Sequence, residues 1–330
     1  MNAKATRMNG RPQLYADLKN DYMFKRIFGS EECKDILKVF LNHIIRDTHI
    51  RDLSFINTEV MGMTEEDSKV IVDIACIADD GSEFIVEMQN ARQEHFRERA
   101  LFYTSYPLQH QKALARQKHK EDNPDETFKW DFELTPVRLI AVVNFAFEHN
   151  DDWPANKSSS SYHIIEDECG ETMTDKLQFI FLELERFDKT ESELVTPYDK
   201  WMYLFKHLEE MTLRPETFSD KEFDHLFDSA NITTFTPEQY EEYQQHENMK
   251  YDYQNCLDYQ YSKGLKEGHS AGLEEGLKQG REKLAEEKIK IAKTCLEMGM
   301  DIPMISTITK LTDFINTGPC QSAGTLFLYI

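Results

Sequence analysis

The chain lacks the sequence features of several common functional classes. Its six cysteines are scattered over 330 residues without a C-x-x-C pair, which argues against a zinc ribbon and against a disulfide framework. It has no H-E-x-x-H motif and no Cys/His cluster, so zinc hydrolysis has no support. It also has no G-x-x-x-x-G-K-[ST] motif, which excludes a P-loop. The cysteine pattern predicts a reducing compartment.

Long apolar runs are also missing. The first 17 residues contain no apolar segment typical of a signal peptide. The longest apolar stretch, Val137–Phe147, is short and is interrupted by Arg138 and Asn144. The sequence therefore predicts neither secretion nor membrane spanning, and we expect a cytoplasmic protein.

Positive charge is scarce overall, because 38 Lys and Arg residues stand against 60 Asp and Glu residues and give a net charge of -22. The imbalance lies entirely in the second part of the chain. Residues 1–120 hold 18 basic and 18 acidic residues, whereas residues 121–330 hold 20 and 42. An amino-terminal part that is neutral overall can still present a basic face to phosphate, so the net charge does not exclude nucleic acid.

The apolar pattern predicts an α/β architecture, with a mixed sheet flanked by helices and a charged helical appendage at the carboxyl end. Helices are expected at 21–28, 33–45, 93–118 and 197–211, and Pro107 is expected to kink or split the third. Strands are expected at 53–61, 69–78, 83–90 and 137–145, with weaker candidates at 162–166 and 177–186. The predicted division is a disordered arm (1–14), an α/β domain (15–232), a helical appendage (233–312) and an atypical tail (313–330).

The appendage contains a repeat of glycines at positions 264, 268, 272, 276 and 280. Each glycine in a helix interior costs about 1 kcal/mol relative to Ala, so propensity alone predicts a charged linker that is helical only in part. A four-residue period also suits the close approach of two helices, which predicts a homo-oligomer formed through this segment. Both interpretations stay open at the level of sequence.

Two apolar runs, 70–77 and 84–89, each carry one carboxylate where a buried strand is expected. Asp73 lies in the first run and Glu87 in the second. A lone ionised carboxylate inside a sheet costs several kcal/mol, so it needs a hydrogen-bond or cation partner, and a divalent metal ion is such a partner. We therefore expect Asp73 and Glu87 to form the functional centre.

The segment between the two runs, residues 79–82, has the composition of a hairpin turn. A three-residue loop at 80–82 would pair Asp79 with Glu83 and place Asp73 opposite Gln89. Glu87 would then be the diagonal neighbour of Asp73, at roughly 5.5 to 8 Å between Cα atoms, close enough for one hard cation to bind both acids.

These features together resemble the PD-(D/E)XK nuclease superfamily, and more narrowly its recombination-promoting nuclease and transposase branch, the Rpn family. The resemblance runs from about residue 16 to about residue 211. It rests on several separated blocks in a fixed order: Asn20–Gly29, Val72–Ile74, Ile85–Gln89, Glu98–Ser105 and Leu177–Leu184.

The resemblance implies a metal-dependent DNA endonuclease that promotes recombination or mobile-element transposition. Asp73 and Glu87 would bind Mg²⁺ or Mn²⁺, with the backbone carbonyl of Met88 as a third ligand. Gln89 stands where the superfamily usually has Lys. A neutral amide can orient a water molecule but cannot lower its pKa by charge, so more of the activation would fall on the metal.

Other charged residues are candidates for supporting roles. Lys69 or Arg92 could supply the positive charge that Gln89 lacks. Asp21 is either an additional acid of the site or an acid favoured by the dipole at a helix N-terminus. Lys112, Arg116 and Lys120 follow i, i+4 spacing, at which like charges repel unless an anion faces them. Together with Arg92 they are the candidate DNA-binding residues, although a solvated helix face would explain the run equally well.

Two other classes of function stay open. The neutral Gln89 and the acidic composition also suit a catalytically weak or inactive nuclease fold that serves as a DNA-binding or interaction module. The glycine repeat suits an assembly factor that does not bind DNA.

Overall fold

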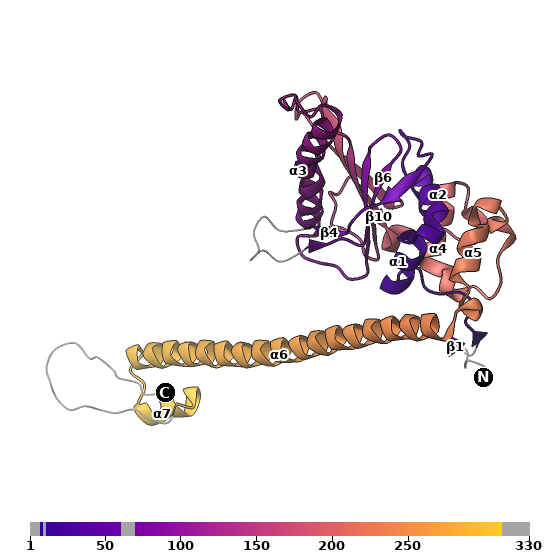
Figure 1. Ribbon diagram of the computed structural model, residues 1–330. Coiled ribbons are helices and arrows are strands. Elements are labelled where there is room, and N and C mark those ends of the chain that lie inside the picture. The colour runs from indigo at the N-terminus through magenta and orange to yellow at the C-terminus, as the bar shows by residue number, and fades with distance from the viewer. Residues whose placement is uncertain (1–6, 9–10, 61–69, 312–330) are drawn as a thin grey trace. The chain divides into compact units, whose positions relative to one another are not determined.

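The computed structural model of the chain describes residues 7–8, 11–60 and 70–311. Met61, Lys69, most of the predicted arm and the tail from residue 313 lie outside the described residues. The chain divides into two units, Met1–Lys250 and Tyr251–Ile330. The first unit is built around a six-stranded mixed sheet (Figure 1).

The sheet has the strand order β3-β6-β7-β8-β10-β9. The β6–β7 pair is an antiparallel hairpin, β8 runs parallel to both β7 and β10, and β9 is antiparallel to β10 at the edge. All seven residues of β8 are buried, as expected for a strand with two parallel neighbours and helices on both faces. The bounds are β3 Leu53–Phe55, β6 Ile74–Ala78, β7 Glu83–Gln89, β8 Val137–Val143, β9 Ser159–Ile165 and β10 Thr172–Glu183. Two short ladders lie outside it: β1 Arg7–Met8 with β2 Arg11–Pro12, and β4 Glu59–Val60 with β5 Val70–Ile71.

Helices cover both faces of the sheet. One face packs against α1, α2, α4 and α5 in a large apolar core rich in Phe, Leu and Ile, and the other packs against α3. The predicted apolar stripe of the second helix is buried as expected: Ile36, Leu37, Phe40, Leu41 and Ile44. The helix bounds are α1 Asp21–Phe28, α2 Lys34–Ile44, α3 Phe96–Asp122, α4 Pro197–His207, α5 Asp224–Ala230, α6 Pro237–Glu297 and α7 Ile302–Thr309. The predicted fold class is confirmed. None of the described helices is long and apolar enough to cross a membrane.

The hairpin loop differs from the prediction by one position. The amide of Ala78 donates to the carbonyl of Ser82 (2.9 Å), so the loop is 79–81 rather than 80–82, and Ile77 rather than Asp79 pairs with Glu83. The third loop residue, Gly81, has φ 84°, a left-handed conformation that glycine adopts without steric cost. The glycine therefore fixes the position of the loop and, with it, the register of the two strands.

The predicted split of the third helix at Pro107 and the predicted partial helix at the glycine repeat are both wrong. α3 continues through Pro107, whose ring is buried against the sheet, so tertiary packing offsets the hydrogen bond that proline cannot make. α6 is helical through all five glycines of the repeat, where the intervening Lys, Glu, Leu and Gln residues are strong helix formers.

The glycine repeat gives a first testable prediction. A methyl group added at Gly272 or Gly276 would meet no atom within 4 Å. The double change to Ala is therefore expected to stabilise α6 by about 1 kcal/mol per site, measured as a shift of its helical circular dichroism to higher temperature. If the repeat instead packs against a second copy of the chain, the same variant would form smaller particles in light scattering and would not gain stability.

Candidate active site

The two acids of the hairpin lie side by side. Asp73 falls in the break between β5 and β6, and the register Ile74 to Val86 places it next to Glu87. The amide of Asp73 donates to Oε1 of Glu87 (3.1 Å), and the amide of Met88 donates to Oδ2 of Asp73 (2.9 Å). The predicted pairing of Asp73 with Gln89 is wrong, because moving the loop by one residue moves every cross-strand partner by two. The acids are therefore nearer to each other than the predicted diagonal.

Burial makes this pair of acids unfavourable when both are ionised. The Glu87 side chain is 1% exposed and that of Asp73 16%. Burial raises the pKa of Asp73, and burial together with the negative charge of Asp73 raises the pKa of Glu87 to about 8. A pair of this kind is stabilised by a proton or by a bound cation.

A lysine that was not predicted for the site contacts Asp73. Nζ of Lys25, on α1, lies 3.5 Å from Oδ1 of Asp73 and 2.7 Å from Oδ1 of Asp21. Burial alone would lower the pKa of Lys25, but Asp21 and Asp73 raise it above its ordinary value, so the ammonium stays charged. Asp21 thus contacts the site through Lys25. The i, i+4 spacing of Asp21 and Lys25 was visible in the sequence, but nothing local showed that α1 lies against this end of the hairpin.

The opposite side of the pair is lined by α3. A guanidinium nitrogen of Arg99 lies 4.0 Å from Oε2 of Glu87, and Nε of Arg99 donates to the hydroxyl of Tyr103. Gln89 Nε2 donates to the same Oε2 of Glu87 at 3.4 Å. The two carboxylates therefore face a lysine from α1, an arginine from α3 and the amide of Gln89.

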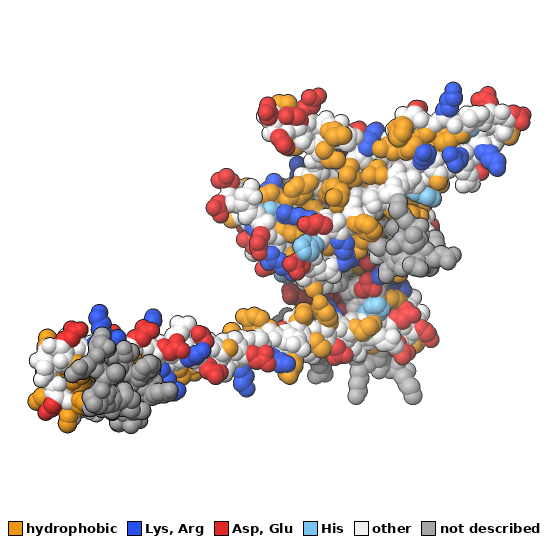
Figure 2. All heavy atoms as spheres, turned by 90° about the vertical axis from the view of Figure 1, so that its left-hand side faces the viewer, with side chains coloured by type: hydrophobic (Ala, Val, Ile, Leu, Met, Phe, Trp, Pro, Cys, Tyr) orange, Lys and Arg blue, Asp and Glu red, His pale blue; other side chains and the backbone are white. Residues whose placement is uncertain are grey.

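The candidate DNA-binding residues separate into two groups. Lys112, Arg116 and Lys120 line one shallow groove of about 470 Å³ on α3, and Figure 2 shows basic and apolar side chains side by side on the projecting end of this helix. Arg92 lies elsewhere and pairs with Glu148 (2.6 Å). The structure thus brings three of the four together.

The donor set at the hairpin suits a hard divalent cation. Among the residues that the structure describes, no three His, Cys, Asp or Glu side chains cluster as a metal site would require. Magnesium, however, is commonly held by one or two carboxylates and keeps several water ligands. Two neighbouring carboxylates, one buried and one half-buried and each with a raised pKa, fit that requirement.

A mixed sheet with paired acids on its hairpin and helices on both faces defines a nuclease-type α/β fold. The family model for the PD-(D/E)XK nuclease family transposase matches residues 18–260, and the chain belongs to this family. The match confirms the resemblance seen in the sequence. No curated protein and no solved structure matches the chain.

Proposed function

We propose that the protein is a metal-dependent DNA endonuclease that acts in recombination or in the movement of mobile elements. The observation that carries the proposal is the contact between the half-buried Asp73 and the buried Glu87 in a chain of a nuclease family. Their carboxylates and the Met88 carbonyl would hold Mg²⁺ or Mn²⁺. When bound, such an ion polarises a phosphate and lowers the pKa of a water molecule.

The protein's own side chains would position the substrate. Lys25 places a permanent positive charge beside Asp73, where it would attract the phosphate and supply the charge that Gln89 lacks. The amide of Gln89 donates to Glu87, which leaves its carbonyl oxygen free to accept a hydrogen bond from water and orient it. Lys112, Arg116 and Lys120 would contact phosphates away from the cleaved bond.

Plasmid cleavage tests the proposed activity. Purified protein is expected to nick supercoiled DNA in Mg²⁺ or Mn²⁺ and to leave it intact in EDTA. Equal nicking with and without EDTA would contradict a metal-dependent mechanism.

The role of Lys25 gives a second prediction. Lys25→Ala is expected to lower the cleavage rate by roughly 100-fold, the scale of losing one preorganised charge at a reacting phosphate, and Lys25→Arg is expected to restore part of it. Lys34→Ala is the matched control, because Lys34 also pairs with an aspartate, Asp52 at 2.9 Å, but lies on α2 and not on α1. Wild-type cleavage by Lys25→Ala would remove Lys25 from the mechanism.

A nuclease fold that binds DNA without cutting it is the second candidate, favoured by the neutral Gln89 at the position where the superfamily usually has Lys. It predicts DNA retention in EDTA and no cleavage in either metal. We also propose a cytoplasmic location. The described cysteines are all free, which supports a reducing compartment.

A further inference from the structure

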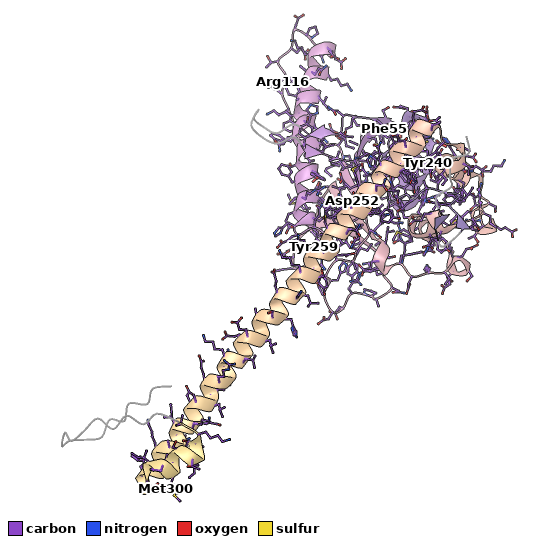
Figure 3. All side chains as sticks on the ribbon, turned by 90° about the horizontal axis from the view of Figure 1, so that it is seen from below. Phe55, Arg116, Tyr240, Asp252, Tyr259 and Met300 are labelled. Carbon is purple, nitrogen blue, oxygen red and sulfur yellow. The ribbon has the colours of Figure 1, made fainter. Side chains whose placement is uncertain are left out.

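Aromatic rings lie next to the basic groove of α3. Residues 123–136, which connect α3 to β8, fold back toward the helix. The ring of Trp130 lies 5.3 Å from Nζ of Lys112, and the ring of Phe128 lies 5.8 Å from the guanidinium carbon of Arg116. Figure 3 shows Arg116 on the part of α3 that extends away from the sheet. We call the following set the α3 surface: Lys112, Arg116, Lys120, Trp130 and Phe132.

The two rings of the α3 surface form a stacked pair in which Trp130 is half-buried and Phe132 faces solvent. Trp130 and Phe132 have centroids 4.5 Å apart and ring planes 28° apart. Phe132 is 72% exposed and has φ 64°, a conformation that is strained for a bulky side chain. The fold would be more stable if the Phe132 ring were buried. It would also be more stable if the backbone of Phe132 had an unstrained conformation. Stability of the fold therefore does not explain why a phenylalanine occupies this position.

The three cations of the α3 surface are available to an external anion. No carboxylate among the described residues forms an ion pair with Lys112, Arg116 or Lys120, although the chain as a whole is strongly acidic. They are spaced one helical turn apart, about 6 Å along the axis, so each repels the next. A string of phosphates would relieve that repulsion.

We propose that the α3 surface binds an unpaired stretch of DNA, whose bases stack on Phe132 and Trp130 while its phosphates contact the three cations. The inference rests on the proposed function and specifies its substrate as DNA that has a single-stranded segment some distance from the cleaved bond. The faces of a base are free to stack on an aromatic ring only when the base is unpaired and unstacked, whereas duplex DNA offers this surface its phosphates alone. A basic groove beside exposed aromatic rings is the combination found in single-strand binding sites.

Binding in EDTA tests the inference without depending on cleavage. The full chain is titrated against a fluorescent 12-nucleotide thymidine strand and against a 12-base-pair duplex, and fluorescence anisotropy is recorded. Phe132→Ala is expected to weaken binding of the single strand by about 5- to 100-fold, the range for losing one stacked base, and to leave duplex binding almost unchanged. Phe132→Tyr, which keeps the ring, is expected to bind like wild type.

Two controls separate stacking from charge and from misfolding. Tyr261→Ala removes a ring that is equally exposed, but on α6, and is expected to change neither affinity. Arg116→Ala is expected to weaken the binding of both DNA forms and to reduce the salt dependence of binding.

Unchanged single-strand affinity in Phe132→Ala, or an equal loss of affinity for both DNA forms, would overturn the inference. A protein ligand would then be the occupant to seek. If the chain binds the single strand but does not cut DNA, the result supports the proposed DNA-binding role of the α3 surface and contradicts the proposed endonuclease activity.

Discussion

Replacing Glu87 by Gln is expected to reduce DNA cleavage by roughly 100-fold or more and, in the absence of metal, to make the protein more stable. The activity falls because the variant loses one of two carboxylates proposed to hold the cation. The stability rises because a neutral amide fits a site that is 1% exposed and lies beside Asp73 better than an ionised carboxylate does. A residue that costs stability and supplies activity is typical of an active site.

The stability effect depends on pH in a defined direction. The pKa of Glu87 is about 8 in the folded protein, above its ordinary value of 4.5. The folded state therefore holds the proton of Glu87 more tightly, and the contribution of Glu87 to wild-type stability falls as pH rises from about 4.5 to about 8. Melting temperatures in EDTA should show Glu87→Gln gaining several degrees over wild type at pH 8 and almost none near pH 4.

Metal ions and a second buried acid provide the controls for Glu87. Mg²⁺ is expected to raise the melting temperature of the wild type but not that of Glu87→Gln, because a ligand stabilises only the state that binds it. Glu83→Gln is the matched variant, since Glu83 is also a buried acid on β7 and also has a pKa raised by burial, but pairs with Gln111 away from Asp73. Loss of cleavage in Glu83→Gln, or full cleavage by Glu87→Gln, would contradict the proposed site.

A chain that ends at Lys250 is expected to fold, whereas one that ends at Asn231 is not. The first turns of α6 belong to the first unit. Tyr243 is 1% exposed, and its hydroxyl accepts hydrogen bonds from the amide of Asp17 (3.2 Å) and from Gln13 Nε2 (3.1 Å). Loss of a buried aromatic side chain costs about 3 to 5 kcal/mol, a large part of the stability of an ordinary domain.

An ion pair between α6 and Asp17 also stabilises the first unit. Lys250 lies 2.6 Å from Oδ2 of the buried Asp17, and Lys19 lies 2.7 Å from its other oxygen. Burial alone would raise the pKa of Asp17, but the two lysines hold it below its ordinary value. The ion pairs therefore stabilise the fold at neutral pH, and this contribution is lost as pH falls through the folded pKa. Circular dichroism of the two truncated chains measures the contribution. Lys250→Ala is a milder variant and is expected to lose about 2 kcal/mol, because Asp17 keeps its pairing with Lys19. Cooperative melting of the chain ending at Asn231 would contradict this prediction. Because of the contacts of Tyr243 and Lys250, we propose that the functional domain extends to Lys250.

The sequence predicted the parts of the fold that depend on local pattern. Strand alternation and the turn residues correctly predicted a hairpin with a three-residue loop and both acids near one another. The exact register depended on which loop position needs a left-handed residue, and Gly81 takes the third position rather than the second. One residue of error there changed the partner of Asp73 from Gln89 to Glu87.

Contacts between distant segments could not be predicted in this way. Lys25 reaches Asp73 only because α1 packs against the end of the hairpin. The residues next to Lys25 in the sequence predict only its pairing with Asp21. Phe132 lies in a segment without periodicity, so no pattern indicated that it would stack on Trp130 beside α3. Residues that act through tertiary contacts were therefore missed, while residues marked by burial within a strand were found.

The amide of Asp73 is held by a side chain. It donates to the carboxylate of Glu87, so one oxygen atom serves both the local conformation and the charge of the site. Any ligand that withdraws this oxygen would release the amide, which would then exchange its hydrogen with solvent faster. Occupancy of the site can therefore be followed at a single peptide group, without DNA and without turnover.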